Sequence, residues 1–273
     1  MALTIHCFFS DGYSERGGMY PFLKKWNDRI DWIQVFPSHV KEKPGPKPGT
    51  IEKPKPTGST GKDFISRVKK YLVLPSTLKA IRDGDYILLV DDADCRFSAY
   101  SEVLDKQASL ESEFKALTRK DIRLRLLLAS PELEAWFYAD WKNSISLLVR
   151  QQYRERFGWE DSRWVRVLAM VQRRFRKILK EHGYSTDTPE WSAMPYNTVT
   201  GTCTYKFSSF IGMALDQTSI LIHNRKIVLE PPRLEYKKDR DGSVLLKNID
   251  PARVSQKCKV FFAPVYEELS QLK

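Results

Sequence analysis

The chain has 273 residues, of which 42% are hydrophobic, and it carries 45 Lys and Arg against 34 Asp and Glu, a formal net charge of +11. This hydrophobic content is sufficient to bury a core, which excludes global disorder, and the length suggests one large domain or two modest ones. A sequence pI near 9.4 favours an anionic partner, with nucleic acid as the first candidate, although an ordinary basic protein has the same charge.

The cysteines and the apolar segments argue against a zinc-binding, a disulfide-rich and a membrane-spanning protein. Cys7, Cys95, Cys203 and Cys258 form no CxxC pair, so neither a zinc site nor a disulfide framework is expected. No apolar run approaches the roughly 20 residues that span a bilayer. The opening residues lack the basic start and the long apolar core of a signal peptide. We therefore expect a cytoplasmic protein without a membrane partner.

The first half of the chain alternates short apolar runs with segments of helical periodicity. Strands are expected at residues 3–9, 30–36, 85–90 and 123–129. Helices are expected at residues 15–26, 63–72, 76–82 and 99–117. This alternation predicts an α/β fold with a mostly parallel sheet flanked by helices.

A Lys- and Pro-rich segment at residues 41–56 interrupts this pattern. Proline removes backbone donors and glycine removes stiffness, so an exposed loop is expected. Lys53, Lys55 and Lys62 could contact the phosphates of a nucleic acid. A solvated insertion without a ligand explains the same composition.

The pattern changes after about residue 142, which divides the chain into a predicted catalytic domain at 1–142 and a basic helical and short-strand region at 143–273. Within the second region we expect an Arg-rich helical segment at residues 143–182 and an irregular segment at 183–204. A helix is expected at residues 207–215, and short strands with a hairpin turn at Asp241-Gly242 are expected at 219–247. A final helix is expected at residues 262–272.

The densest basic patch outside the loop is formed by Arg173, Arg174, Arg176 and Lys177. Arginine supplies bidentate donors that are always charged, so this patch could bind phosphate backbones. An amphipathic helical pair with arginines in water, or a surface for a partner protein, explains the same residues. The interleaved aromatic side chains have near-helical spacing, which favours packing on the sheet domain over stacking on bases.

Acidic residues follow three of the four predicted strands: Asp11 and Glu15, then Asp91, Asp92 and Asp94, then Glu132 and Glu134. The carboxyl ends of parallel strands share one edge of a sheet, where open α/β sheets bind ligands. Single residues of this kind are often turn residues, helix caps or partners of a helix dipole. Their recurrence after three strands suggests a shared site.

The spacing of these acids predicts which of them meet. Asp11 and Glu15 are four residues apart and face the same point if a helix begins between them. Asp92 and Asp94 point the same way in an extended chain, whereas Asp91 points elsewhere. Clustered carboxylates raise one another's pKa, and Mg²⁺ or Mn²⁺ relieves the repulsion. One or two such cations could assist phosphodiester hydrolysis, with a free carboxylate as general base.

Several of these segments resemble a known family. Residues 9–16 (FSDGYSER) are similar to the V-E-G-x-T-E motif of Toprim domains in nucleases of the overcoming-lysogenization-defect type, and residues 88–94 (LLVDDAD) resemble their D-x-D strand. Residues 131–140 (PELEAWFYAD) resemble the E-L-E-A-W-x-x-x-D signature of a Toprim-like family of unknown function, and residues 205–210 (YKFSSF) its later S-x-S-F element.

The resemblance covers residues 3–140 well and 141–215 loosely, and it implies a Toprim-like sheet and a Mg²⁺-dependent nuclease that cuts DNA or RNA. It implies that Asp11, Glu15, Asp92 and Asp94 are ligands or catalytic groups, with Asp91 and Glu132 as further metal-ligand candidates and Glu134 assisting catalysis. Asp11 departs from the family pattern, because it stands at a glutamate position with a side chain one methylene shorter.

The resemblance also implies a setting and an alternative function. Members of this group accompany ATPase subunits in bacterial anti-phage defence, so an ATPase partner is expected. The shortened side chain at Asp11 favours the alternative of a catalytically weak interaction subunit that scaffolds or regulates such an ATPase. The sequence does not fix the oligomeric state, and a homo-oligomer stays open.

Overall fold

The computed structural model describes most of the chain, with gaps, at residues 3–37, 60–94, 96–97, 99–157, 163–187, 190, 196–197, 202–203, 206–224 and 233–272. Lys53 and Lys55 of the Lys- and Pro-rich segment lie outside these residues, so their predicted role is not tested. None of the helices in the described ranges combines the length and the apolar character that crossing a membrane requires.

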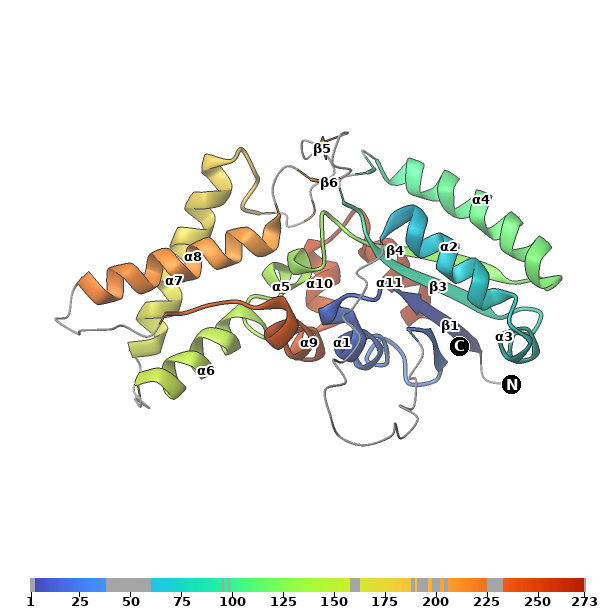
Figure 1. Ribbon diagram of the computed structural model, residues 1–273, viewed down its shortest axis with the longest axis horizontal. Helices are drawn as coiled ribbons and strands as arrows, with labels where there is room; N and C mark the ends of the chain where they lie inside the picture. Colours follow the sequence, from blue (N-terminus) through green and yellow to red (C-terminus); the bar gives the residue numbers. More distant parts are fainter. Residues whose placement is uncertain are drawn as a thin grey trace, which may run out of the picture.

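A four-stranded sheet lies at the centre of the fold, with the order β2-β1-β3-β4 and only parallel pairs. Its strands are β1 (Thr4–Phe9), β2 (Asp31–Phe36), β3 (Tyr86–Asp92) and β4 (Arg123–Ala129). β3 is buried along its whole length, as expected for a parallel strand covered on both faces. The predicted α/β fold, with a parallel sheet flanked by helices, is confirmed (Figure 1).

Helices cover both faces of this sheet (Figure 1). One face carries α2 (Gly61–Leu72) and α4 (Tyr100–Thr118), with α3 (Pro75–Ala80) following α2. The other face carries α1 (Tyr13–Leu23), α5 (Glu134–Ala139), α9 (Lys238–Asn248), α10 (Pro251–Lys257) and α11 (Ala263–Ser270). Side chains alternate along β3, so Leu89 packs in one core with Phe64 and Phe114, whereas Val90 packs in the other with Phe22.

The remaining elements extend away from the sheet, at the left of Figure 1 and at its top. They are α6 (Ile145–Phe157), α7 (Arg163–Glu181), α8 (Phe207–Asn224) and the short antiparallel pair β5 (Tyr196–Asn197) and β6 (Thr202–Cys203). Tyr138 of α5 packs on Phe175 of α7 and Phe207 of α8, so the larger core continues into this region. The division of the chain at residue 142 stays a prediction.

The expected hairpin at Asp241-Gly242 is wrong, because both residues lie in α9, and α8 extends to Asn224 through another part of the expected strand region. Gly242 allows a close approach of α9 to α1, since a Cβ there would lie 2.0 Å from the Ser14 hydroxyl oxygen. Asp241 lies in the first turn of α9, where a carboxylate complements the helix dipole. An Asp-Gly pair that favours a hairpin in isolation thus serves helix packing here.

The strand order also fixes where a ligand site is expected. The chain leaves β1 towards β2 on one side and returns to β3 on the other side, so the connection direction reverses between β1 and β3. A crevice forms outside the carboxyl ends of the strands at such a reversal. Asp11 and Glu15 follow β1, and Asp92 ends β3.

Candidate functional site

Glu15 and Asp92 are the first two members of a buried acid cluster at this reversal. Glu15 lies in the first turn of α1, and one of its carboxylate oxygens accepts a hydrogen bond of 2.9 Å from the Ser10 hydroxyl. Its other oxygen, Oε2, is buried and has no hydrogen-bond partner among the described residues. A Cβ at Gly12 would lie 2.3 Å from this oxygen, so glycine leaves room for the carboxylate.

Asp92 points to the same face of the sheet as Val90, towards α1 and α9. Its Oδ1 accepts a hydrogen bond of 2.9 Å from the backbone N–H of Leu133, just before α5. Burial raises the pKa of Asp92 well above the ordinary value, and the neighbouring Glu15 carboxylate adds to the increase. The pKa of Glu15 is raised as well, again chiefly by burial.

Glu134, at the start of α5, is fully buried and is held by two residues from the distant α9 region. Tyr236 donates its hydroxyl proton to Glu134 Oε1 at 2.8 Å, and Lys238 Nζ lies 3.3 Å from the same oxygen. Burial and the Glu134 carboxylate together raise the pKa of the Tyr236 hydroxyl. A neutral phenol therefore bonds a carboxylate at this position.

Glu132 completes the cluster from the loop between β4 and α5. Its Oε1 accepts a hydrogen bond of 2.6 Å from the backbone N–H of Ser208, in the first turn of α8. Burial, reinforced by the nearby Glu134 carboxylate, raises the pKa of Glu132 to about 7. The cluster therefore contains a carboxyl group that titrates near neutral pH.

Lys238 is the cation at the centre of this acid cluster, which we define as Glu15, Asp92, Glu132 and Glu134 with Lys238. Its charge acts on all four carboxylates. Burial alone lowers the pKa of the ammonium group, but the four surrounding carboxylates outweigh this effect and raise it. Four acids thus share one lysine, and repulsion between carboxylates adds to the burial that raises the pKa values of Glu15, Asp92 and Glu132.

Asp11 and Asp91, both predicted as metal ligands, have other partners. Asp11 forms an ion pair with Arg16, whose Nη2 lies 2.7 Å from Asp11 Oδ2. Asp91 points to the opposite face of the sheet from Asp92, where Arg96 Nη2 and the Gly61 N–H donate to its Oδ2 at 2.9 and 2.8 Å. The predicted opposite orientations of Asp91 and Asp92 are observed.

Asp94 lies between these two environments. Its backbone adopts a left-handed conformation with φ of 46°, and its N–H donates to Pro131 O at 2.9 Å. Its charge raises the pKa of both Asp91 and Asp92. Asp94 therefore acts on the acid cluster from its margin.

The donor set of the cluster fits a hard cation in its chemistry, because all four acids offer carboxylate oxygens and Glu15 Oε2 has no partner among the described residues. Its present geometry differs from a metal site: within the described ranges no three His, Cys, Asp or Glu side chains are arranged to hold a metal ion. Lys238, which is paired with Glu134, already supplies the four acids with part of the positive charge that a bound cation would bring.

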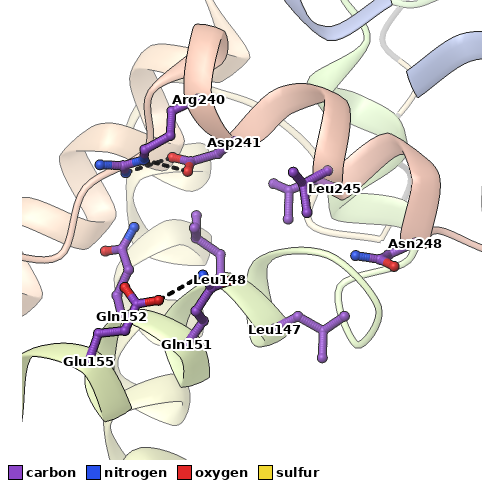
Figure 2. Close-up of a pocket in the computed structure, with 10 residues that line it drawn as sticks. Leu147, Leu148, Gln151, Gln152, Glu155, Arg240, Asp241, Leu245 and Asn248 are labelled. Atoms are coloured by element: carbon purple, nitrogen blue, oxygen red, sulfur yellow. Dashed lines mark hydrogen bonds and ion pairs between the residues drawn. The ribbon is translucent and has the colours of Figure 1, made fainter. Parts of the chain in front are cut away.

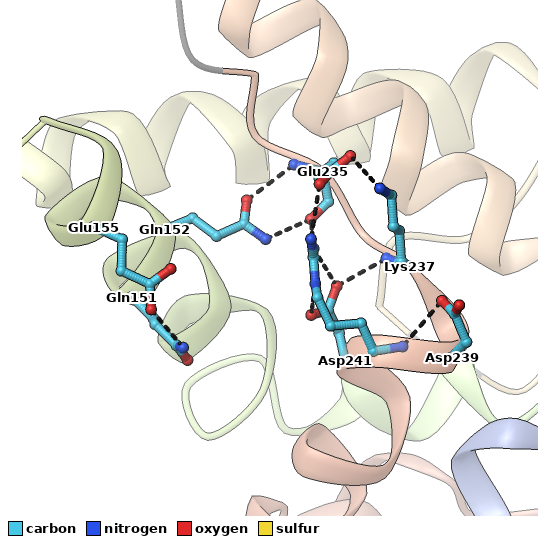
Figure 3. A network of polar contacts seen from close by, with 8 residues as sticks. Gln151, Gln152, Glu155, Glu235, Lys237, Asp239 and Asp241 are labelled. Carbon is cyan, nitrogen blue, oxygen red and sulfur yellow. Dashed lines mark hydrogen bonds and ion pairs between the residues drawn. The ribbon is translucent and has the colours of Figure 1, made fainter. Parts of the chain in front are cut away.

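The segment that contains Tyr236 and Lys238 is hydrogen-bonded to α6 (Figure 3). Gln152 donates its side-chain N–H to Glu235 O at 2.6 Å and accepts from the Glu235 N–H at 3.0 Å. Arg240 bonds the Glu235 carboxylate at 2.7 Å. These contacts fix the backbone just before Tyr236, and the Lys237 N–H, which donates to Asp241 Oδ2 at 2.8 Å, fixes it just after.

A cavity of about 320 Å³ lies beside this attachment, between α6 and α9 (Figure 2). Leu148 and Leu245 line its apolar part, and Gln152, Arg240 and Asp241 line its polar part. The same polar residues hold α9 in place, so this cavity is part of the packing that positions Lys238.

The predicted basic patch lies on α7. Arg173, Arg174 and Lys177 line a concavity of about 400 Å³ with Leu221 of α8. Arg176 instead bonds the Tyr138 hydroxyl and lowers its pKa in opposition to the larger effect of burial. The aromatic side chains of this region pack inward: Tyr153 and Phe175 are buried, and Trp164 is partly buried against the core.

Sequence reasoning missed Tyr236 and Lys238, which lie about a hundred residues beyond Glu134 in a segment that was expected to form short strands. No local motif marks them. The sequence signal for a helix there is the pair of acidic residues, Asp239 and Asp241, in the first turn of α9.

Comparisons of the chain with protein-family models, with curated proteins and with solved structures gave no match. The function is therefore inferred from the geometry of the acid cluster and its surroundings.

Proposed function

We propose that the acid cluster is the active site of a divalent-cation-dependent nuclease. The observation that carries the proposal is the charge imbalance of the cluster, in which four carboxylates from three strand ends share one ammonium group. A buried surplus of negative charge is costly, and a second cation relieves it. The family resemblance of residues 9–16 and 88–94 supports the same chemistry.

Glu15, Asp92 and Glu134 would hold the cation after a rearrangement of the present geometry, because they lie on α1, β3 and α5 close enough for their charges to act on one another. A bound Mg²⁺ or Mn²⁺ supplies charge compensation at a phosphodiester oxygen. Glu132, with a pKa near 7, is suited to accept a proton from the attacking water. Lys238 would move from the carboxylates towards a phosphate oxygen of the substrate.

The concavity on α7 and α8 supports nucleic acid as the substrate. Arg173 and Lys177 are exposed, and with Arg174 they present three positive charges on one surface. Such a surface binds a phosphate backbone without regard to sequence. DNA and RNA satisfy this chemistry equally.

A cleavage assay with plasmid, single-stranded DNA and total tRNA tests the proposal, with Mg²⁺ or Mn²⁺ compared with EDTA. Cleavage is expected to require the cation and to be lost in Asp92→Asn and Glu134→Gln. Asp11→Asn is the matched control, because Asp11 is paired with Arg16 outside the cluster and the variant should stay active. Loss of activity in Asp11→Asn alone would contradict the assigned ligand set.

Two ion pairs favour a second candidate function, a catalytically weak subunit that scaffolds or regulates an ATPase. Lys238 already compensates part of the cluster charge, and Asp11 is neutralised by Arg16. Titration calorimetry with Mn²⁺ separates the two functions independently of activity. If the folded wild type binds no Mn²⁺ and cleaves none of the three substrates, the nuclease proposal fails and the scaffold remains.

A further inference from the structure

A further cavity, of about 430 Å³, lies on the opposite face of the sheet from the acid cluster and is lined by residues of α2 and α4. Its floor is formed by Leu126 and Leu128 of β4, which belong to the core on this face. Asp91 contributes from the end of β3, one residue before Asp92. The two sites therefore lie back to back across one strand.

The rim of this cavity carries an excess of positive charge. Its two acids are each matched, Asp91 by Arg96 at 2.9 Å and Glu113 by Lys69 at 2.5 Å. Lys62 on α2 and Lys106 on α4 also line the cavity, and neither has an ion-pair partner within the part of the chain that the structure describes. Two ammonium groups on facing helices are left for an anion.

The floor and one wall suit a flat apolar group. Arg96 stacks its guanidinium over the Phe97 ring, with 5.9 Å between the guanidinium carbon and the ring centroid. Leu126 and Leu128 lie beneath this wall. Ligand pockets typically combine such an apolar lining with a few placed charges, at volumes of roughly 300 to 1,000 Å³.

We propose that this cavity binds a free nucleoside phosphate, with the base against Phe97 and the leucine floor and the phosphate between Lys62 and Lys106. A planar base stacks on an aromatic or guanidinium surface, and ammonium groups form charge-assisted hydrogen bonds with phosphate oxygens. An inorganic anion would leave the apolar floor unused. The site is independent of the acid cluster and of the proposed nuclease activity.

Titration calorimetry with ADP, GDP, CDP and UDP tests this site, in EDTA so that cation binding at the acid cluster plays no part. At least one nucleotide is expected to bind the wild type, and adenosine or inorganic phosphate alone should bind at least about tenfold more weakly than the nucleotide. Lys62→Ala/Lys106→Ala should weaken nucleotide binding by about a hundredfold, since each of the two lost charge-assisted hydrogen bonds contributes about tenfold.

Lys70→Ala/Lys79→Ala is the matched control, because it removes the same charge from exposed positions of α2 and α3 that do not line the cavity. All four lysines are exposed, so both double variants should fold, which circular dichroism checks. Binding of none of the nucleotides, an equal loss in the control, or equal affinity for inorganic phosphate would overturn the proposal. Displacement of bound nucleotide by a single-stranded oligonucleotide lacking a terminal phosphate would also overturn it, and would assign Lys62 to a nucleic-acid surface.

Discussion

Asp91 and Asp92 are neighbours at the end of β3, yet they lie in opposite electrostatic environments. Asp91 has its own guanidinium partner and a backbone donor, so its charge is matched locally. Asp92 shares one lysine with three other carboxylates. Burial raises the pKa of both groups, and the charges of three other carboxylates raise that of Asp92 further, whereas only the charge of Asp94 does so for Asp91. A surplus of charge, rather than acidity of the segment, thus distinguishes the candidate active site.

The largest loss of stability is expected when Lys238, the cation that the four carboxylates share, is replaced. Lys238→Met should lower the free energy of unfolding by about 3 kcal/mol at pH 8, at the lower end for a broken buried ion pair because the lysine side chain stays 32% exposed. The loss should shrink at pH 5, since protonated carboxyl groups need no counter-ion. Urea unfolding at both pH values measures it.

Arg96→Met is the corresponding change on the Asp91 face and serves as the comparison. It should cost about half as much, because only one carboxylate loses a partner and Asp91 keeps the Gly61 N–H. Equal losses of unfolding free energy in Lys238→Met and Arg96→Met would contradict the proposed electrostatic difference between the two faces of the sheet.

The second effect is a pH dependence on the Asp92 face. Glu132 has a pKa of about 7 in the folded protein and about 4.3 in an unfolded chain. The folded state therefore holds the extra proton between these values, and this stabilisation is complete below pH 4.3 and lost as the pH rises through 7. Glu132→Gln keeps an oxygen for the Ser208 N–H and should reduce the fall in stability between pH 5 and 8 by about 2 kcal/mol.

Glu190 provides a control for this pH dependence, because it lies outside the acid cluster and also has a pKa raised to about 7 by burial. Glu132→Gln should therefore keep part of the fall in stability with rising pH, and the double variant with Glu190→Gln should show a smaller fall in urea unfolding. Asp92 and Glu15, whose pKa values are also raised, account for what then remains. An unchanged slope in Glu132→Gln would show that this carboxyl group titrates normally.

A smaller effect is expected at the attachment of the α9 segment. Gln152→Ala removes two hydrogen bonds to the Glu235 backbone and should destabilise this contact by about 1 to 2 kcal/mol. Native-state hydrogen exchange should become faster at residues 233–238 and stay unchanged in α2, on the other face. Faster exchange in both places would indicate a global loss of stability instead.

The smallest effect compares the two neighbouring aspartates directly. Asp92→Asn keeps the acceptor for the Leu133 N–H and removes one surplus charge, so it should raise the free energy of unfolding by about 1 kcal/mol at pH 7. Asp91→Asn removes a matched charge and should lower it by about 1 kcal/mol. Changes of the same sign in thermal or urea unfolding would contradict the comparison.

The sequence by itself determined the four strands of the sheet and the edge of the sheet at which the acidic residues lie. Apolar runs of strand length, alternating with helical periodicity, were enough for all four strands, since a parallel strand buried on both faces is apolar along its length. The alternation of side chains in a strand also separated Asp91 from Asp92. These features depend on local geometry, which a single sequence encodes directly.

Only the tertiary structure decided which charges meet. Lys238 and Tyr236 reach Glu134 because α9 packs against α1 through Gly242, and no spacing in the sequence links residues a hundred positions apart. Asp11 pairs with Arg16 although its position after β1 predicted a metal ligand. The partner of a buried charge depends on how distant elements pack and on which other polar groups are buried beside it. Local periodicity in the sequence carries no information about packing or about the burial of those groups.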